Sequence, residues 1–141
     1  MADYSTLTSR FAGRARRLID SGDRASLLYA ALEIRLGVEA RLQSYVQASH
    51  EVSAALKKGW QIPKLFSGLE KTFSNSSQVV EFTMSSPSSP PITLHFVPVN
   101  AQLKRDAEQF GNALHVTAKS HSEDDWWTAL RVAAERAVVD L

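Results

Sequence analysis

The sequence predicts a mainly α fold, an antiparallel bundle of four to five helices with a β-hairpin inserted around residues 78–97. Two patterns lead to this prediction. Over most of the chain, apolar residues recur three and four positions apart, which is the period of an amphipathic helix. Between residues 78 and 97 they alternate with polar residues, which is the period of a half-buried strand. A chain of 141 residues has the length of one domain, so we expect residues 1–141 to share a single core.

The composition favours a reducing compartment and no contact with membranes. The chain has no cysteine, which excludes disulfides, thiolate metal sites and cysteine nucleophiles. No apolar run approaches the roughly 20 residues of a membrane span, and the N-terminus lacks the apolar segment of a signal peptide. We therefore expect a cytoplasmic protein without a membrane partner.

The charge is nearly balanced. A formal net charge of +1 argues against a strongly electrostatic nucleic-acid binder. Residues 1–64 contain ten Lys and Arg against six Asp and Glu, whereas residues 65–141 contain six against nine. A solvated surface and an anionic ligand both explain this mild asymmetry.

The first helix is predicted over residues 3–20, with Ser21-Gly22 as its end. Its apolar stripe comprises Leu7, Phe11, Ala15 and Leu18 or Ile19. On another side of the same helix, Arg10, Arg14 and Arg17 lie three or four residues apart. These arginines form either an exposed basic face or a patch that faces the phosphates of a nucleic acid.

The longest helix is predicted between Asp23, a good N-cap residue, and Gly59, a good C-terminal stop. Two apolar stripes run along it: one comprises Leu28, Leu32, Leu42 and Val46, and the other Leu27, Ala31, Ile34, Val38 and Tyr45. Arg35 and Glu39 interrupt the first stripe, which we expect to face the core. An unbroken helix here would be about 52 Å long, more than a domain of this size accommodates. We therefore expect a bend, a break or an overhang near Ser49-His50.

The remaining elements follow in order. Pro63 suits the first turn of a short third helix, whose buried side comprises Leu65, Phe66, Leu69 and Phe73. Residues 78–84 and 92–97 are the strands, joined by a long, mobile Ser/Pro-rich tip. An isolated hairpin is only marginally stable, so its apolar face must pack on the helices or on another chain. A fourth helix is expected over about 101–119, and Ser122 is expected to cap a fifth.

The charges within the long helix are the first candidate for a functional site. A buried charge needs a partner, so Arg35 and Glu39 must pair with each other or with groups on neighbouring helices. Together with Glu33 they form either a structural ion-pair network or an internal polar site that binds a ligand or performs acid–base chemistry.

Further candidates lie later in the chain. Gly111 interrupts the fourth helix, which suggests a close backbone approach, and His115 lies one turn further on, within possible reach of Glu33 or Glu39. Trp60 is either a packing anchor or a stacking platform, and Lys64 at a helix start would suit an anionic partner. The four histidines have no metal-ligand spacing and no cofactor-binding motif is present, so we predict neither a metal nor a cofactor.

Three short motifs in this order resemble a group of uncharacterised bacterial helical domains allied to the HEPN superfamily. They are E-x-R-x-x-x-E, a connector with Trp, Pro and Lys, and G-x-x-L-H; the matching residues are Glu33, Arg35, Glu39, Trp60, Pro63, Lys64, Gly111, Leu114 and His115. The similarity spans about residues 10–116. It implies an antiparallel helical bundle, often dimeric, in toxin–antitoxin pairs, phage defence or RNA handling.

HEPN ribonucleases carry an arginine followed, after four to six residues, by a histidine on one helix. This sequence has no such pair, since Arg105 precedes His115 by ten positions and Arg41 precedes His50 by nine. The resemblance therefore implies a non-catalytic binding or oligomerisation module of a bacterial stress or defence system, acting as a homodimer or with a partner protein. The alternative is an RNase-like or nucleotide-modifying enzyme whose site comprises Arg35, Glu39 and His115.

Overall fold

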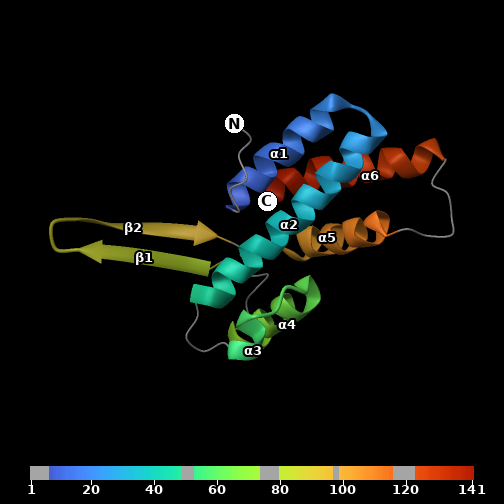
Figure 1. The fold of residues 1–141 in the computed structure, drawn as a ribbon. Helices are drawn as coiled ribbons and strands as arrows, with labels where there is room; N and C mark the ends of the chain where they lie inside the picture. Colours follow the sequence, from blue (N-terminus) through green and yellow to red (C-terminus); the bar gives the residue numbers. More distant parts are fainter. Residues whose placement is uncertain (1–6, 49–52, 74–79, 97–98, 116–122) are drawn as a thin grey trace.

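The computed structural model describes residues 7–48, 53–73, 80–96, 99–115 and 123–141. These residues form six helices and one two-stranded antiparallel sheet, so the mainly α fold with a hairpin is confirmed (Figure 1). The number of helices exceeds the predicted four to five, because the short α3 is separate from the long helix before it. The elements are α1 (Thr8–Ser21), α2 (Arg24–Ala48), α3 (Ala54–Lys57), α4 (Ile62–Phe73), β1 (Val80–Ser86), β2 (Ser89–Phe96), α5 (Ala101–Leu114) and α6 (Asp124–Asp140). None of the described helices is both long and apolar enough to cross a bilayer.

α1 and α2 form an antiparallel helical hairpin, and both predicted end signals are confirmed. α1 begins at Thr8 and not at residue 3, because its N-cap residue Leu7 is extended. Gly22 ends α1 in the left-handed conformation, with φ of 83°, and its N–H donates to the carbonyl of Ile19 at 3.2 Å. Asp23 caps α2, since its Oδ1 accepts the backbone N–H of Ser26 at 2.8 Å. Two residues therefore suffice to reverse the chain.

α2 is the centre of the bundle, because α1, α4, α5 and α6 all pack on it. Its fully buried residues are Leu27, Ala30, Ala31, Ile34, Val38, Leu42 and Val46. The core therefore contains most of the second predicted stripe. In the first stripe, Leu42 and Val46 are buried, Leu28 is half-buried and Leu32 is exposed. The expectation that Arg35 and Glu39 lie in the middle of the core-facing stripe was wrong: they lie at its edge, where charged groups remain partly hydrated.

The long helical segment is interrupted, as its length predicted. α2 ends at Ala48 and α3 begins at Ala54, whereas residues 49–52, where the break was expected, lie outside the described residues. The side-chain amides of Gln43 and Gln47 each donate to the carbonyl of Lys57 at 2.7 Å. These bonds attach the C-terminal end of α3 to α2. Pro63 lies in the first turn of α4, as predicted.

α5 and α6 complete the bundle. Leu103, Ala107 and Phe110 of α5 lie four and three residues apart and are buried against the core. The predicted extent of this helix, to about residue 119, was wrong: α5 ends at Leu114, because the backbone of its C-cap residue His115 is extended. The predicted cap Ser122 lies outside the described residues. The N-cap position of α6 is Glu123, whose side chain accepts no capping bond.

The hairpin has the predicted alternation but not the predicted tip. Phe82 pairs with Leu94 and Met84 with Ile92, while Glu81 pairs with His95. Pairing continues to Ser86 and Ser89, with a bulge after Met84, so the tip is a turn of two residues and not a long loop. Proline is tolerated in this two-stranded sheet because its φ of about −65° lies within the broad β region, and because an edge strand does not need the N–H that proline lacks. Neither strand packs on a described helix, and the hairpin extends away from the bundle (Figure 1).

Candidate functional site

A polar cluster lies where α2 meets α5. Nε of Arg35 donates to Oε1 of Glu39 at 3.3 Å, so the two charges pair with each other. Their side chains keep 26% and 18% of their exposure, which leaves the pair partly hydrated. The Arg35 guanidinium lies so close to Gly111 that a Cβ at Gly111 would overlap it. The close approach predicted for this glycine is therefore confirmed, and its neighbour is the arginine.

Glu33 belongs to a different contact on the other side of α2. Its Oε2 accepts a hydrogen bond from Nε of Arg14 at 2.9 Å, and the Arg14 guanidinium lies 4.6 Å from the ring centroid of Phe11. Arg14 therefore joins α1 to α2. Arg10 and Arg17 are exposed, as predicted for a basic face. Arg14, which lies between them, instead pairs with Glu33.

His115 is the C-cap residue of α5 and is exposed. Among the described residues, its side chain forms no hydrogen bond to Glu33 or Glu39; its backbone N–H donates to the carbonyl of Asn112 at 3.3 Å. The predicted cluster is thus divided. Arg35, Glu39 and Gly111 come together, Glu33 pairs with α1, and His115 faces solvent at the end of its helix.

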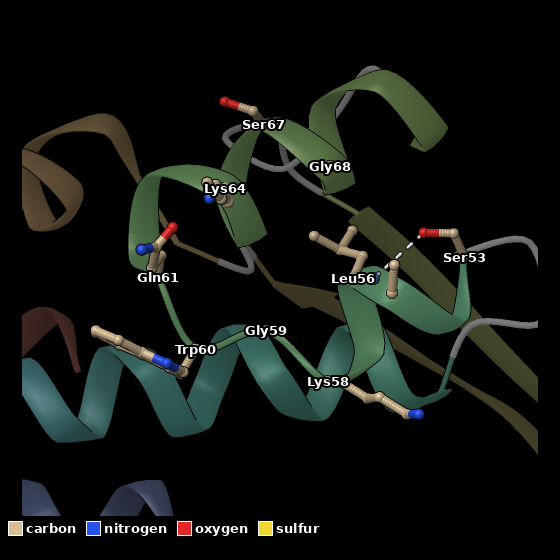
Figure 2. A pocket seen from close by; sticks show the side chains of 10 residues that line it. Ser53, Leu56, Lys58, Gly59, Trp60, Gln61, Lys64, Ser67 and Gly68 are labelled. Atoms are coloured by element: carbon tan, nitrogen blue, oxygen red, sulfur yellow. Dashed lines mark hydrogen bonds between the residues drawn. The ribbon is translucent and has the colours of Figure 1, made fainter.

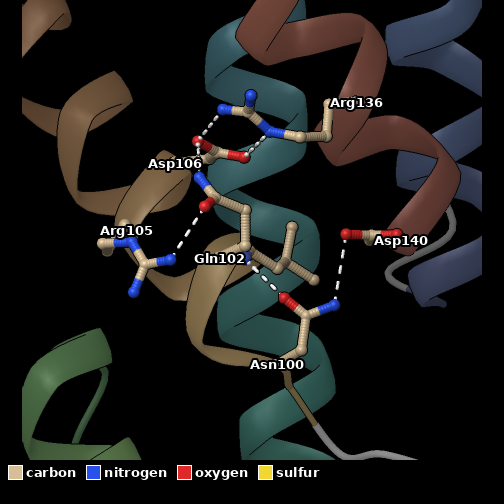
Figure 3. A network of polar contacts seen from close by, with 7 residues as sticks. Asn100, Gln102, Arg105, Asp106, Arg136 and Asp140 are labelled. Carbon is tan, nitrogen blue, oxygen red and sulfur yellow. Dashed lines mark hydrogen bonds and ion pairs between the residues drawn. The ribbon is translucent and has the colours of Figure 1, made fainter.

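A second polar cluster joins α5 to α6 and was not predicted. Asp106 is 2% exposed and receives two hydrogen bonds from Arg136, at 3.0 Å to Oδ2 and 2.6 Å to Oδ1. Gln102 donates to the same carboxylate at 3.0 Å and accepts from Arg105 at 2.8 Å (Figure 3). The hydrogen bonds and the charge of Asp106 raise the pKa of the Arg136 guanidinium above its usual value. The cluster is a fully paired contact between helices.

The sequence did contain a signal for Asp106. It lies three residues after Leu103 and four before Phe110, within the apolar stripe of its helix.

Two further arginines bind carbonyls at helix ends, where unpaired acceptors gather. Arg131 donates to the carbonyls of Ile19 and Gly22, both at 3.1 Å, and Arg41 donates to that of Asp140 at 2.9 Å.

A pocket of about 690 Å³ lies at the corner between α3 and α4 (Figure 2). Lys58, Trp60 and Lys64 line it, with Gln61, Ser53 and Ser67. The indole of Trp60 is exposed, so Trp60 does not anchor the core. No Asp or Glu lines this pocket. Two of the predicted candidates, Trp60 and Lys64, therefore line the same open corner, and in Figure 2 the side chains of Trp60 and Lys58 point in opposite directions.

These features define a mainly helical bundle with paired polar clusters at its helix contacts and a projecting hairpin. Over the described ranges, no group of three or more His, Asp and Glu side chains is placed to hold a metal ion. No protein-family model, curated protein or solved structure matches the chain.

Proposed function

We propose that this protein is a binding and oligomerisation module that holds a second protein chain through its hairpin. The observation that supports this proposal is the exposure of one apolar side of the hairpin. Met84, Ile92 and Leu94 are 46%, 56% and 48% exposed, and they lie on alternate positions of the paired strands. We call these three residues the hairpin apolar face.

The opposite side of the hairpin is suited to water. Nε2 of His95 lies 3.1 Å from Oε2 of Glu81, and the hydroxyls of Thr83 and Thr93 share a hydrogen bond at 3.1 Å. A hairpin with one apolar and one polar side is the form that packs on another surface. Burying a side chain such as Ile or Leu contributes about 1.5–3 kcal/mol, whereas an isolated two-stranded hairpin is marginal. A partner would therefore stabilise the hairpin as it binds.

The cellular setting comes from the sequence resemblance. The order of the three motifs and the helical bundle agree with a HEPN-like domain of the bacterial cytoplasm that serves a stress, toxin–antitoxin or phage-defence system. In this setting the cluster has a structural role: the Arg35 guanidinium pairs with Glu39 within α2 and lies against Gly111 of α5. The hairpin, and not this cluster, is the surface offered to a partner.

The proposal is tested by light scattering after size-exclusion chromatography, together with affinity capture from the host. Ile92→Glu places a charge on the hairpin apolar face and should abolish both self-association and capture. Thr93→Glu is the matched control, because it introduces the same residue in the same strand on the polar side, and it should behave as the wild type. A wild-type protein that is strictly monomeric and captures nothing would contradict the proposal, as would equal behaviour of the two variants.

The pocket between α3 and α4 supports a second candidate function, the binding of a nucleotide. It is an open corner lined by two lysines and an exposed indole, without an Asp or Glu. Lysine attracts phosphate, and an indole provides a face for a base to stack on. Titration calorimetry with nucleoside monophosphates should show binding that Lys58→Gln with Lys64→Gln removes. Arg16→Gln, which removes an exposed charge from α1, should leave it unchanged; equal loss in both would indicate non-specific attraction.

A further inference from the structure

Two contacts fix how α1 lies along α2 (Figure 1). Nε of Arg14 donates to Oε2 of Glu33 at 2.9 Å. Phe11 lies against Gly37, since a Cβ at Gly37 would be 3.0 Å from Cβ of Phe11. From the first contact to the second, α1 steps back by three residues while α2 advances by four, which is about one turn of each helix. Successive turns of the two antiparallel helices therefore stay opposite each other.

The next turn in the other direction brings an arginine beside an aromatic ring. It leads from Arg14 to Arg17 on α1 and from Glu33 to Tyr29 on α2. Both new residues are exposed, Tyr29 to 59%. Among the described residues, none forms a hydrogen bond or an ion pair with the Arg17 guanidinium. A charged group and an accessible ring therefore lie next to each other on the surface, although they belong to different helices.

Further positive charge lies on the same side of α1. Arg10, Arg14 and Arg17 are four and three residues apart, so they share one side of the helix, and Arg10 is exposed. The Arg17 side chain turns back over Gly13: its Nη1 would lie 3.9 Å from a Cβ there. The Arg17 guanidinium is thereby directed toward the turn that carries Arg10. Glu33 pairs with Arg14, the middle arginine, so positive charge exceeds negative charge along this row.

The chemistry of this surface matches a single-stranded nucleic acid. Guanidinium groups bind phosphates, and an exposed aromatic ring offers a face on which a base stacks. Positions 10 and 17 are about 10 Å apart along the axis of α1, at about 1.5 Å per residue. A strand with about 3.4 Å between phosphates places about three of them over that length. A lipid membrane fits less well, because the apolar side of α1 is buried in the bundle.

We propose that single-stranded nucleic acid binds along the α1–α2 contact, with its phosphates on Arg10 and Arg17 and a base stacked on Tyr29. The Arg14–Glu33 pair lies between them and neutralises the carboxylate. This inference goes beyond the proposed function, because neither the hairpin apolar face nor the pocket between α3 and α4 takes part. Only a few phosphates are contacted, which agrees with the net charge of +1.

Fluorescence anisotropy of a labelled single strand of about 12 nucleotides, titrated with the full chain at several salt concentrations, tests the proposal. The logarithm of the association constant should fall with the logarithm of the salt concentration, by about 0.7 for each phosphate bound. Arg17→Gln should lower this slope by about 0.7 and weaken binding about fivefold at about 0.1 M salt. Arg16→Gln is the matched control and should change neither. It removes the adjacent exposed charge of the same helix, but Arg16 follows Arg14 by two positions and so lies on the opposite side of α1.

Tyr29 provides an independent test, because stacking does not depend on charge. Tyr29→Ala should weaken binding of the single strand at least about fivefold without changing the salt slope, and Tyr29→Phe should restore it. Binding of a duplex should not respond to Tyr29→Ala, because its bases are already stacked on one another. Trp60→Ala is the control, since Trp60 is an exposed aromatic residue outside this surface, and it should bind as the wild type does. Circular dichroism checks the fold of each variant.

Four results would overturn the inference: no binding of the strand at low salt, equal losses in Arg16→Gln and Arg17→Gln, full binding by Tyr29→Ala, or binding of anionic lipid vesicles in place of the strand. Loss of binding in Trp60→Ala alone would also overturn it, and would favour the pocket between α3 and α4. None of these results bears on the hairpin, which Ile92→Glu tests separately, so failure of this inference leaves the proposed function standing.

Discussion

The guanidinium of Arg35 lies against the backbone of Gly111, in the space that a side chain at position 111 would occupy. The two residues are on different helices, α2 and α5, and the contact sets how closely these helices approach. Glycine in a helix costs about 1 kcal/mol relative to alanine, so its presence here has a packing reason. Removing either residue should therefore change the effect of removing the other.

The first prediction is a non-additive pair of substitutions. With Arg35 replaced by alanine, Gly111→Ala should stabilise the protein by about 1 kcal/mol, because the space is free and alanine favours the helix. With Arg35 present, the new methyl group must displace the guanidinium from Glu39, so the gain is lost. The two effects of Gly111→Ala should differ by at least about 1 kcal/mol in urea denaturation. Equal effects in both backgrounds would show that the guanidinium moves aside at no cost.

The position of Arg35 also shows what the sequence could and could not predict. Both stripes of α2 have helical spacing, and spacing alone does not say which of them meets the other helices. Both stripes were expected to be apolar, with the two charges in the middle of the main one. Ala31, Ile34 and Val38 of the uncharged stripe are buried, and so are Leu42 and Val46 of the other, whereas the Arg35 and Glu39 side chains keep 26% and 18% of their exposure. Charge was the useful signal: a carboxylate and a guanidinium are placed more cheaply at the edge of a buried surface than at its centre.

The second prediction concerns Asp106, whose carboxylate is almost inaccessible to water. The Asp106 carboxylate accepts three hydrogen bonds from side chains. Arg136→Met removes two of them and leaves the one from Gln102. A buried carboxylate that loses its partner costs about 1–3 kcal/mol, so urea denaturation should detect a loss of that size. Arg105→Met is the matched control, because Arg105 is exposed and donates to Gln102, not to the carboxylate. Equal stabilities of these two variants would count against a structural role for the Asp106–Arg136 pair.

The third prediction follows from the capping residue of α2. Hydrogen bonds from the side chain and backbone of Ser26 lower the pKa of Asp23 from 3.8. The folded state therefore binds this proton less tightly than the unfolded state. The resulting stabilisation is complete above the unfolded pKa and disappears as the pH falls through the folded pKa.

Asp23→Asn isolates this effect, because asparagine also caps helices but does not titrate. The wild type should be the more stable protein at neutral pH, and the difference in urea midpoint should shrink below about pH 4. Denaturation curves at several pH values between 7 and 3 measure it. A difference that stays constant over this range would mean that the charge of Asp23 contributes nothing to the cap.

The alternation of apolar and polar residues correctly predicted the hairpin, whereas the predicted long tip was wrong. Period two places Met84, Ile92 and Leu94 on one side, and this depends on nothing outside the strands. Serine and proline, however, fit a loop and an extended edge strand equally well, so the composition of residues 85–91 could not determine where pairing stops. Burial of the hairpin was also expected from its pattern, and within this chain the structure shows none on the described helices. Whether a strand face is covered depends on other surfaces, which a local pattern does not contain.

The last prediction compares two glycines of the α1–α2 hairpin whose surroundings differ. A Cβ at Gly37 would lie 3.0 Å from Cβ of Phe11, an atom fixed to the backbone of α1, and would also crowd Leu141. Gly37→Ala should therefore push α1 away from α2 and destabilise the protein by about 1–3 kcal/mol. A Cβ at Gly13 meets nothing nearer than Nη1 of Arg17 at 3.9 Å, so Gly13→Ala should stabilise it by about 1 kcal/mol. Thermal denaturation should move the two melting temperatures in opposite directions; a rise in both would mean that α1 is free to shift on α2.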